Sequence, residues 1–320
     1  MAERERLNLT EKIATKSSDL SSIDERLGRW AEAQGREKSN SPTRRAMRRF
    51  RQHRLAMVGV LIIAILVVAA LLGSREAALE QNLRNINKPP STEHLLGTDR
   101  IGRDILARVL VGGRISLSVG LVAVVFSTTI GIVTGAIAGY YRGWVDHVIM
   151  RVVDVVLSFP VIVLLLSVAS IVGPNIFNLM VMIGLLTWPI PCRIMRGQFL
   201  SLREKDYIEA AHAIGVSNFN VARKHILPNA IAPILVYSSF GVATAVLLEA
   251  GLSYLGLGVQ PPTPSWGNML NTARSISTLE RALWQWVPPG ILTVLFVLAV
   301  NFVGDGIRDA LDAQAIEKNR

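Results

Sequence analysis

The side chains that most often perform chemistry in proteins are few in this chain, and they form no recognisable site. No Ser/His/Asp arrangement follows from the spacing, and there is no G-x-x-x-x-G-K-[ST] loop to hold the phosphates of ATP. The histidines form neither an H-x-x-x-H nor a Cys/His pattern of the kind that binds metal ions. They are His53, His94, His147, His212 and His225. We therefore expect no catalytic residue, no metal site and no cofactor bound by this chain.

The composition points to membrane lipid as the surroundings of much of the chain. Half of the 320 residues are hydrophobic and 18% are charged, whereas soluble domains carry about a quarter of charged residues. The net charge of +10 comes from basic residues at the ends of apolar runs, where they orient helices across a bilayer. A nucleic-acid partner is therefore not expected. The single cysteine, Cys192, lies in an apolar run and is expected to be an inert packing residue.

Five uncharged apolar stretches are near or above the length of about 20 helical residues that crosses a bilayer core. The third is too long for one span, and the segment VGPN at residues 172–175 breaks it, which predicts a hairpin of two spans. Six spans predict an all-α integral membrane protein rather than a soluble helical core. The stretches are Met57–Leu72, Ile115–Tyr141, Val155–Cys192, Asn229–Leu248 and Leu283–Gly304.

The distribution of Lys and Arg predicts that the N- and C-termini are cytoplasmic. With six spans both ends lie on one side, and placing them inside puts 25 of the 34 basic residues in cytoplasmic segments. Fourteen of these precede residue 55. About 55 mostly hydrophilic residues precede the first apolar stretch, which is too long for the n-region of a cleavable signal peptide.

Two segments on the predicted outer side have distinct patterns. Residues 97–114, at the end of the first loop, place apolar and charged side chains on opposite helical faces, which predicts an amphipathic interfacial helix. Gly112 and Gly113 would then turn the chain into the second span. The prolines of QPPTPSWGN predict a rigid irregular last loop. Three tryptophans are expected at the headgroup level: Trp266, Trp284 and Trp286.

A polar segment of residues 193–228, called the insert below, separates the fourth and fifth predicted spans. Asp206–Ile214 favours a helix, and its alanines would let another backbone approach closely. Gly215 is placed to end this helix in the left-handed conformation. Ser217 is placed to cap a second helix, which Pro228 ends. We predict that the insert is a rigid docking site for another protein rather than an ordinary solvated loop.

The insert also carries the residues of a known signature. Its EAAHAIG…LP resembles the EAA signature of permease subunits of bacterial ABC importers: E-A-A, three residues, Gly, nine residues, Ile, any residue, Leu, Pro. His225 stands at the Ile position, which departs from the general signature, yet the ending HILPN resembles the dipeptide/oligopeptide/nickel branch. The matching residues are Glu209, Ala210, Ala211, Gly215, Leu227 and Pro228.

Two further motifs are similar to those of C-type subunits of the same branch. LGTDRIGRDILARVLVGGRISL and LSYLGLGVQPPTPSWGNML occur in the expected order, and the likeness runs from about Arg44 to Asp312. The resemblance implies a type I ABC importer permease fold with six transmembrane helices in the bacterial inner membrane. The first motif contains the family-signature residues Gly97, Thr98, Asp99, Gly102, Arg103 and Asp104.

The resemblance further implies a set of partners. A second, homologous B-type permease subunit would complete the pathway, and an extracytoplasmic binding protein would deliver the solute. Two ATPase subunits would hold ATP and Mg²⁺, and the short helix around Gly215 would fit a groove of an ATPase, with Glu209 positioning the bend. The ATPase-coupling residues implied for the insert are Glu209, Ala210, Ala211, Gly215, Val216, Ser217, Phe219, Arg223, Leu227 and Pro228.

The same resemblance divides the chain into regions. Most of it falls to an ABC transmembrane domain of five transmembrane helices, residues 115–305, which contains the insert. The others are a cytoplasmic N-terminal tail (1–43), an N-terminal permease region with the first transmembrane helix (44–96), the interfacial helix (97–114) and a cytoplasmic C-terminal tail (306–320).

Di- and oligopeptides are the cargo that the resemblance favours, with nickel or another small solute as the alternative, because the binding protein largely sets specificity. A stand-alone secondary transporter would need ionisable residues at the centres of its spans, where this chain has none. The well-capped insert argues against a purely structural scaffold.

Of the acids near span ends, Asp154 is expected to pair with Arg151, and Asp305 to be interfacial. Glu249 is expected either at an outer gate or among the headgroups.

Overall fold

The computed structural model describes residues 42–311, and every regular element in that range is a helix or a helical turn. The chain divides into two compact units, residues 1–49 and 50–320. Of the first unit, the described residues form the beginning of α2 (Pro42–Gln52). Nearly all of the predicted N-terminal tail, and residues 312–320 of the predicted C-terminal tail, lie outside the described residues.

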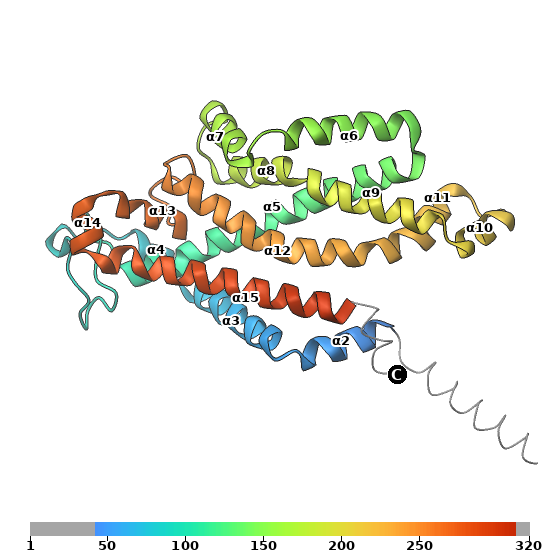
Figure 1. The fold of residues 1–320 in the computed structure, drawn as a ribbon. Coiled ribbons are helices and arrows are strands. Elements are labelled where there is room, and N and C mark those ends of the chain that lie inside the picture. Colours follow the sequence, from blue (N-terminus) through green and yellow to red (C-terminus); the bar gives the residue numbers. More distant parts are fainter. Residues whose placement is uncertain (1–41, 312–320) are drawn as a thin grey trace, which may run out of the picture. The chain divides into compact units, whose positions relative to one another are not determined.

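The second unit is a bundle of long helices with short helices at its two ends (Figure 1). Its α-helices are α3 (Arg54–Leu72), α4 (Arg75–Leu79), α5 (Ile105–Tyr141), α6 (Gly143–Leu157), α7 (Val161–Val172), α8 (Ile176–Thr187), α9 (Pro189–Arg203), α10 (Asp206–Ala213), α11 (Asn218–Val221), α12 (Leu227–Tyr254), α13 (Trp266–Leu270), α14 (Ile276–Arg281) and α15 (Val287–Leu311). Its 3₁₀ and π turns are η1 (Leu83–Asn85), η2 (Ala222–Ile226), η3 (Asn271–Arg274) and η4 (Leu283–Gln285).

Within residues 42–311, four helical runs are long and apolar enough to cross a membrane by themselves: α3, α5, α15 and the run from α11 through α12. Two bent pairs raise the number to six if each pair counts as one span. The bend is 86° between α6 and α7 and 40° between α8 and α9. The prediction of an all-α membrane protein is confirmed, and the six predicted spans are reached when each bent pair is counted as one broken span.

The third apolar stretch, Val155–Cys192, is not the plain hairpin that the sequence predicts. The break at Gly173 is confirmed, since a φ of +85° follows the end of α7. A second break separates α6 from α7 just before Pro160, because a proline ring disfavours the helical conformation of the residue before it. A third lies at Trp188, after which Pro189 begins α9. The first helix of this stretch is therefore α6, which begins at Gly143, well before Val155.

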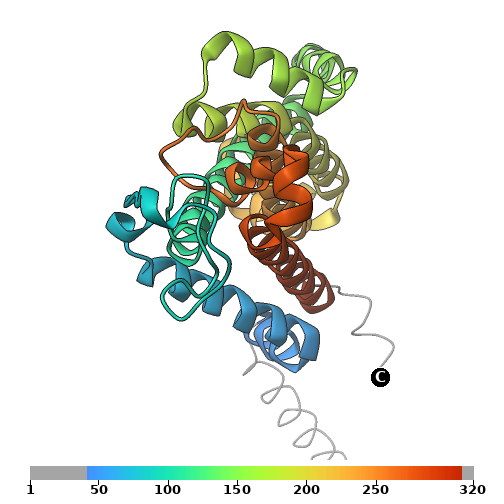
Figure 2. The same cartoon turned by 90° about the vertical axis from the view of Figure 1, so that its left-hand side faces the viewer.

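α5 is the central helix of the second unit and contacts α3, α8, α9 and α12 (Figures 1 and 2). Glycines allow α9 to approach its backbone. A Cβ added at Gly131 would lie 2.7 Å from Cγ of Pro191, and one at Gly139 would lie 2.6 Å from Cβ of Phe199. Real Cβ atoms do not come so close, so a larger side chain at either position would push α9 away. Small residues at helix contacts are a common means of packing in membranes.

The predicted interfacial helix over residues 97–114 does not exist as a separate element. α5 starts at Ile105 and continues without a break through the second predicted span. Gly112 and Gly113 do not turn the chain, because both are in regular helix and buried. Their missing side chains make room for the last loop, and a Cβ at Gly113 would lie 3.1 Å from the ring of Trp266. The glycine pair is thus a packing feature, although in the sequence it resembles a turn.

The remaining predicted spans lie in long helices with shifted ends. α3 contains the whole first stretch and packs along α15. α15 starts at Val287 rather than at the predicted Leu283, because Leu283–Gln285 forms a 3₁₀ turn whose Gln285 is buried. Pro288 and Pro289 then occupy the first turn of α15, where a missing backbone N–H is tolerated.

Candidate coupling site and signature loop

The insert folds as a helix, a sharp corner and a second helix. α10 ends at Ala213 with Ile214 as its C-cap residue, and Gly215 follows with a φ of +82°. The Gly215 N–H donates to the carbonyl of His212 (2.9 Å), and the Val216 N–H donates to the carbonyl of Ala211 (3.1 Å). This pair of bonds is the Schellman motif, which satisfies the last carbonyls of a helix. The predicted corner at Gly215 is confirmed.

The second helix of the insert differs from its prediction at both ends. Ser217 occupies the N-cap position of α11, but its side chain makes no capping hydrogen bond. Pro228 does not end the helix, because α11 passes through the π turn η2 into α12. The run from Asn218 to Tyr254 has 37 residues. A proline lacks the N–H that a helix interior needs, and the wider π turn ends at Ile226, two residues before Pro228.

The insert is anchored on one side and open on the other. Ile208, Val221 and Ile226 are buried in a cluster with Met195 and Phe199 of α9. The opposite face is exposed, including two large apolar side chains, Ile214 (81% exposed) and Phe219 (71% exposed). Other exposed coupling residues are Glu209, Ala210, Gly215, Ser217, Arg223 and Pro228, while Val216 and Leu227 are half-buried and Ala211 is buried. A monomer rarely leaves large apolar side chains together on its surface unless a partner covers them.

A hollow of about 520 Å³ adjoins this exposed face. Tyr140 and Tyr141 at the end of α5 form one wall, and Phe219, Ala222 and Arg223 form another. The walls are largely apolar, and the lining includes one charged side chain, that of Arg223. The end of α5 and the insert therefore present one continuous surface, which the sequence pattern of the insert alone does not reveal.

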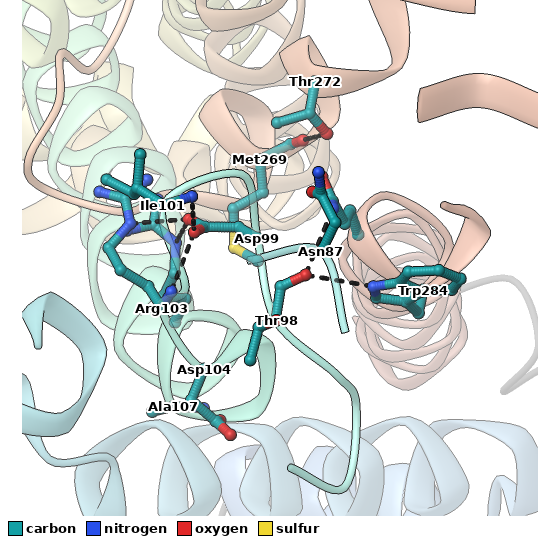
Figure 3. Close-up of polar contacts among 12 residues, drawn as sticks. Asn87, Thr98, Asp99, Ile101, Arg103, Asp104, Ala107, Met269, Thr272 and Trp284 are labelled. Carbon is teal, nitrogen blue, oxygen red and sulfur yellow. Dashed lines mark hydrogen bonds and ion pairs between the residues drawn. The ribbon is translucent and has the colours of Figure 1, made fainter. Parts of the chain in front are cut away.

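The family-signature residues build a tight loop at the other end of α5 (Figure 3). Oδ1 of Asp99 accepts from the backbone N–H groups of Ile101 (2.9 Å) and Arg103 (3.0 Å), and Oδ2 accepts from Nε of Arg103 (2.7 Å). Gly97 and Gly102 have φ values of +73° and +76°, which only glycine adopts readily. The signature spacing is therefore explained by the folding of this loop.

Asp104 and Thr98 connect the signature loop to its neighbours. Oδ1 of Asp104 accepts from the N–H of Ala107 (2.9 Å) and caps the start of α5, and Oδ2 contacts Nδ1 of His94 (2.9 Å). The Thr98 hydroxyl donates to the carbonyl of Asn85. The Thr98 carbonyl accepts from Nε1 of Trp284 (3.2 Å), as Figure 3 shows. The loop before α5 is thus fixed to the turn before α15.

Of the three tryptophans expected at the headgroup level, Trp266 is instead buried in the protein, while the places of Trp284 and Trp286 relative to the headgroups stay a prediction. Trp266 is 2% exposed, and its Nε1 donates to the carbonyl of Val109 in α5 (3.0 Å). Trp284 is half-buried against the signature loop, and Trp286 is also half-buried. Buried indole N–H groups need an acceptor, and for Trp266 and Trp284 the backbone supplies it.

Glu249 lies in the protein interior, so the expectation that placed it among the headgroups is wrong. Its carboxylate is fully buried and accepts hydrogen bonds from three serine hydroxyls. Oε1 accepts from Ser253 (2.7 Å) and Ser265 (2.8 Å), and Oε2 accepts from Ser116 (3.0 Å). Each serine oxygen also accepts a backbone N–H, from Val259, Asn268 and Trp266 respectively. Glu249 therefore ties α5, α12 and the last loop together, and a role as a gate stays a prediction.

The other acids near span ends form contacts that the sequence did not indicate. Asp154 pairs with Arg193 of α9 (2.5 Å) and not with the predicted Arg151. Asp146 of α6 accepts from both Nε (2.5 Å) and Nη2 (2.7 Å) of Arg196 in α9. No local sequence pattern indicates these two ion pairs, because the paired residues lie 39 and 50 positions apart in the chain. Asp305 is exposed.

Among residues 42–311, no group of three or more His, Cys, Asp and Glu side chains is arranged to hold a metal ion. Cys192 is fully buried at the contact between α5 and α9, in agreement with a packing role.

The family described as "Binding-protein-dependent transport system inner membrane component" matches residues 131–316. A second model, "N-terminal TM domain of oligopeptide transport permease C", matches residues 41–90. The chain belongs to the family of inner membrane components of binding-protein-dependent transport systems.

Individual relatives cover most of the chain. The dipeptide transport system permease protein DppC of Alkalihalophilus pseudofirmus is 43% identical over 276 residues, which are 85% of this chain and 90% of that protein. The glutathione transport system permease protein GsiD of Escherichia coli O6:K15:H31 is 40% identical over the same shares of the two chains. A Brucella suis biovar 1 protein, named as a candidate peptide permease, is 45% identical over 87% of this chain and 93% of its own length.

A solved structure shows the same fold. A chain of the MetNI methionine ABC transporter, from a study of its inward-facing conformations, aligns with a TM-score of 0.51 at 18% sequence identity. The alignment covers 64% of this chain and 97% of that one. The chain is accordingly a multi-pass membrane permease subunit with the type I ABC importer fold.

Proposed function

We propose that this chain is the C-type permease subunit of an ATP-driven importer of di- and oligopeptides and forms half of the translocation pathway. Relatives that are at least 40% identical carry the names dipeptide permease and glutathione permease, and dipeptides and glutathione are both short peptides. A B-type permease subunit would supply the other half, an extracytoplasmic binding protein would deliver the peptide, and two ATPase subunits would bind and hydrolyse ATP.

The insert is the site through which ATP hydrolysis would act on this subunit. The observation that supports this most strongly is the continuity of α11, η2 and α12, because the docking surface and a whole membrane span are one helical run. A displacement applied at Phe219 or Arg223 would pass into α12 without a flexible joint. Rigid coupling of this kind is what a switch between two conformations requires.

The proposal places the insert and both termini in the cytoplasm, and the signature loop with α13 and α14 on the outer side. The basic residues support this orientation, since most of them lie in the segments that it makes cytoplasmic. The ATPase subunits would then contact α10 and α11, and the binding protein would reach the opposite end of the bundle.

Deletion and complementation in the native host test the proposal directly. Uptake of a labelled dipeptide, a labelled tripeptide and ⁶³Ni²⁺ is measured in the wild type, in a deletion strain and in the complemented strain. Loss of peptide uptake that the gene restores supports the proposal, whereas loss of nickel uptake alone supports the alternative cargo. Affinity purification in mild detergent should recover two ATPases and a second permease, and recovery of the chain alone would contradict the assembly.

A further inference from the structure

A polar cavity lies beside the signature loop, at the end of the bundle opposite to the insert. It has a volume of about 320 Å³ and is called the signature cavity here. Its walls come from the signature loop, the first turn of α5, the end of α12, the last loop through η3, and η4. The lining includes three charged side chains, Asp99, Arg103 and Arg108, of which the last two are cations.

Two residues that line the cavity, Arg108 and Gln285, each have one buried side-chain atom without a partner in the described part of the chain. Nη1 of Arg108 is buried and makes no hydrogen bond, and Arg108 as a residue is 4% exposed. Oε1 of Gln285 is likewise buried without a donor, and Gln285 is 1% exposed. The Gln285 amide is fixed in orientation, because its Nε2 donates to Oδ1 of Asn87 (2.8 Å) and to the carbonyl of Thr98 (3.2 Å).

The charge of Arg108 is only partly balanced. Its Nε lies 3.7 Å from Oδ2 of Asp99, which is already the acceptor for Nε of Arg103 at 2.7 Å. Two guanidinium groups therefore share one carboxylate, and the lining carries a net positive charge. A buried donor without an acceptor is costly, and more so when it is charged. The lining residues of the signature cavity thus include one unpartnered charged donor and one unpartnered neutral acceptor.

From these features we propose that the signature cavity binds the carboxyl-terminal end of a peptide. The terminal carboxylate would accept from Nη1 of Arg108, and a backbone N–H of the same peptide would donate to Oε1 of Gln285. A simple anion would satisfy only the first of these atoms. The volume is at the small end of ligand pockets and holds about one or two residues. The inference rests on the proposed function and names the feature of the cargo that this subunit recognises.

Protection of an engineered thiol reports occupancy of the cavity locally. Thr272 lines the cavity and bonds only within its own turn, so Thr272→Cys places a reactive group there with little disturbance. The full complex in lipid nanodiscs is treated with a maleimide, with the parent protein as a background control because Cys192 is fully buried. Tri-alanine should slow the labelling, and tri-alanine amide should need about tenfold higher concentration or more for the same effect. Equal protection by the two peptides would overturn the proposal.

Variants distinguish recognition by Arg108 from a general effect of charge. In the Thr272→Cys background, Arg108→Gln should abolish the difference between the acid and the amide. Arg100→Gln is the matched control, because Arg100 lies in the same loop but outside this cavity, where it donates to Oγ1 of Thr278 (2.5 Å). A difference lost equally in both variants would contradict the assignment to Arg108. The comparison of acid and amide in the parent keeps the test decisive if Arg108→Gln does not assemble.

Two further comparisons are needed. The first distinguishes a free peptide from a segment of the binding protein as the occupant of the cavity, and the second distinguishes failure of this inference from failure of the proposed function. If the unliganded binding protein protects the engineered thiol of Thr272→Cys and tri-alanine alone does not, a protein segment fills the cavity, and the inference fails. Normal uptake of tri-alanine by cells without any protection also overturns the inference, yet leaves the proposed function intact. Protection by tri-alanine in a complex that imports no peptide supports the cavity and contradicts the proposed function.

Discussion

At the scale of single residues, the backbone conformation at Gly215, and not the space around it, determines which residue this position accepts. A Cβ added there would meet no atom within 4 Å, so no contact excludes a larger side chain. The φ of +82° is what disfavours one, because L-residues with a Cβ are strained in the left-handed region. The corner of the insert therefore depends on the absence of a side chain that would otherwise fit.

Replacing Gly215 with valine should uncouple ATP hydrolysis from uptake while the protein still inserts. A β-branched residue in this conformation costs roughly 1–2 kcal/mol, which the short insert would relieve by changing its corner. Peptide uptake should fall at least about tenfold, with normal amounts of the subunit in the membrane. Gly197→Val is the control, since Gly197 also has open space but lies within the regular helix α9. Equal loss of uptake in both variants would contradict the role assigned to the corner.

Glu249 carries a different kind of prediction, which concerns stability. Glu249→Ala leaves three buried serine hydroxyls without their acceptor, and each unmade bond costs about 1–3 kcal/mol. The melting temperature of the purified protein should fall by roughly 5 °C or more. Ser118→Ala should change it little, because Ser118 donates to the carbonyl of Ile115 in its own helix. An unchanged melting temperature for Glu249→Ala would show that the cluster contributes nothing to holding α5, α12 and the last loop together.

The roles of these residues differ in how far the sequence predicts them, and the difference has a physical cause. Gly215 could be found because a helix end has a local signature of alanines followed by glycine. Glu249 could be noticed as an acid near a span, with Ser253 one turn later in the same helix, but Ser265 and Ser116 lie 16 and 133 residues away and no local pattern connects them to it. Arg108 and Gln285 carry no sequence signal for the signature cavity, since what distinguishes them is a missing partner in three dimensions.

At the scale of elements, the contact between α6 and α9 depends on two ion pairs of unequal burial. The pair Asp146–Arg196 is bidentate and its carboxylate side chain is 12% exposed. The pair Asp154–Arg193 is a single contact with both side chains about half exposed. α6 follows α5 after a single residue and is joined to α7 by a bend of 86°, and the two ion pairs fix it to α9 near both of its ends.

Arg196→Gln should therefore destabilise the protein more than Arg193→Gln. Loss of hydrogen bonds to a mostly buried carboxylate costs roughly 1.5–3 kcal/mol, whereas an exposed pair contributes about 0–1 kcal/mol. Melting temperatures of the two variants in the same lipid give the comparison. The same ranking should appear in proteolysis of α6, because its release exposes the chain to cleavage. Equal effects would show that burial does not distinguish the pairs.

The sequence predicts the ends of a helix well where a single feature, such as bordering charged residues, determines them. It predicts them poorly where a local turn or helix-ending residue is overridden by packing or by a change in helix type. α3 agrees with its apolar stretch because charged residues border it on both sides. The sequence predicts two elements where α5 is one helix, because Gly112 and Gly113 resemble a turn. In the structure their missing side chains instead leave space for the last loop to pack against α5. α12 was separated from α11 because proline usually ends a helix, and the π turn before Pro228 allows the helix to continue.

At the scale of the whole molecule, the proposed orientation in the membrane can be tested by labelling from one side. Glu93→Cys places a thiol in the loop before α5, and Lys224→Cys places one within the insert, both at exposed positions. A membrane-impermeant maleimide should label the first variant in intact cells and the second only after permeabilisation. Cys192 is buried and should give little background. The reverse pattern would overturn the cytoplasmic assignment of the insert and termini.

The length of α5 has a mechanical consequence. Its 37 residues span about 55 Å, well beyond the roughly 30 Å of a bilayer core. Arg108 lies in its first turn beside the signature cavity, and Tyr140 and Tyr141 lie in its last turn beside the insert. α5 is therefore a lever arm: a tilt of about 5° around one end displaces the other by about 5 Å. A small change of angle at either membrane face becomes a movement the size of a side chain at the opposite face.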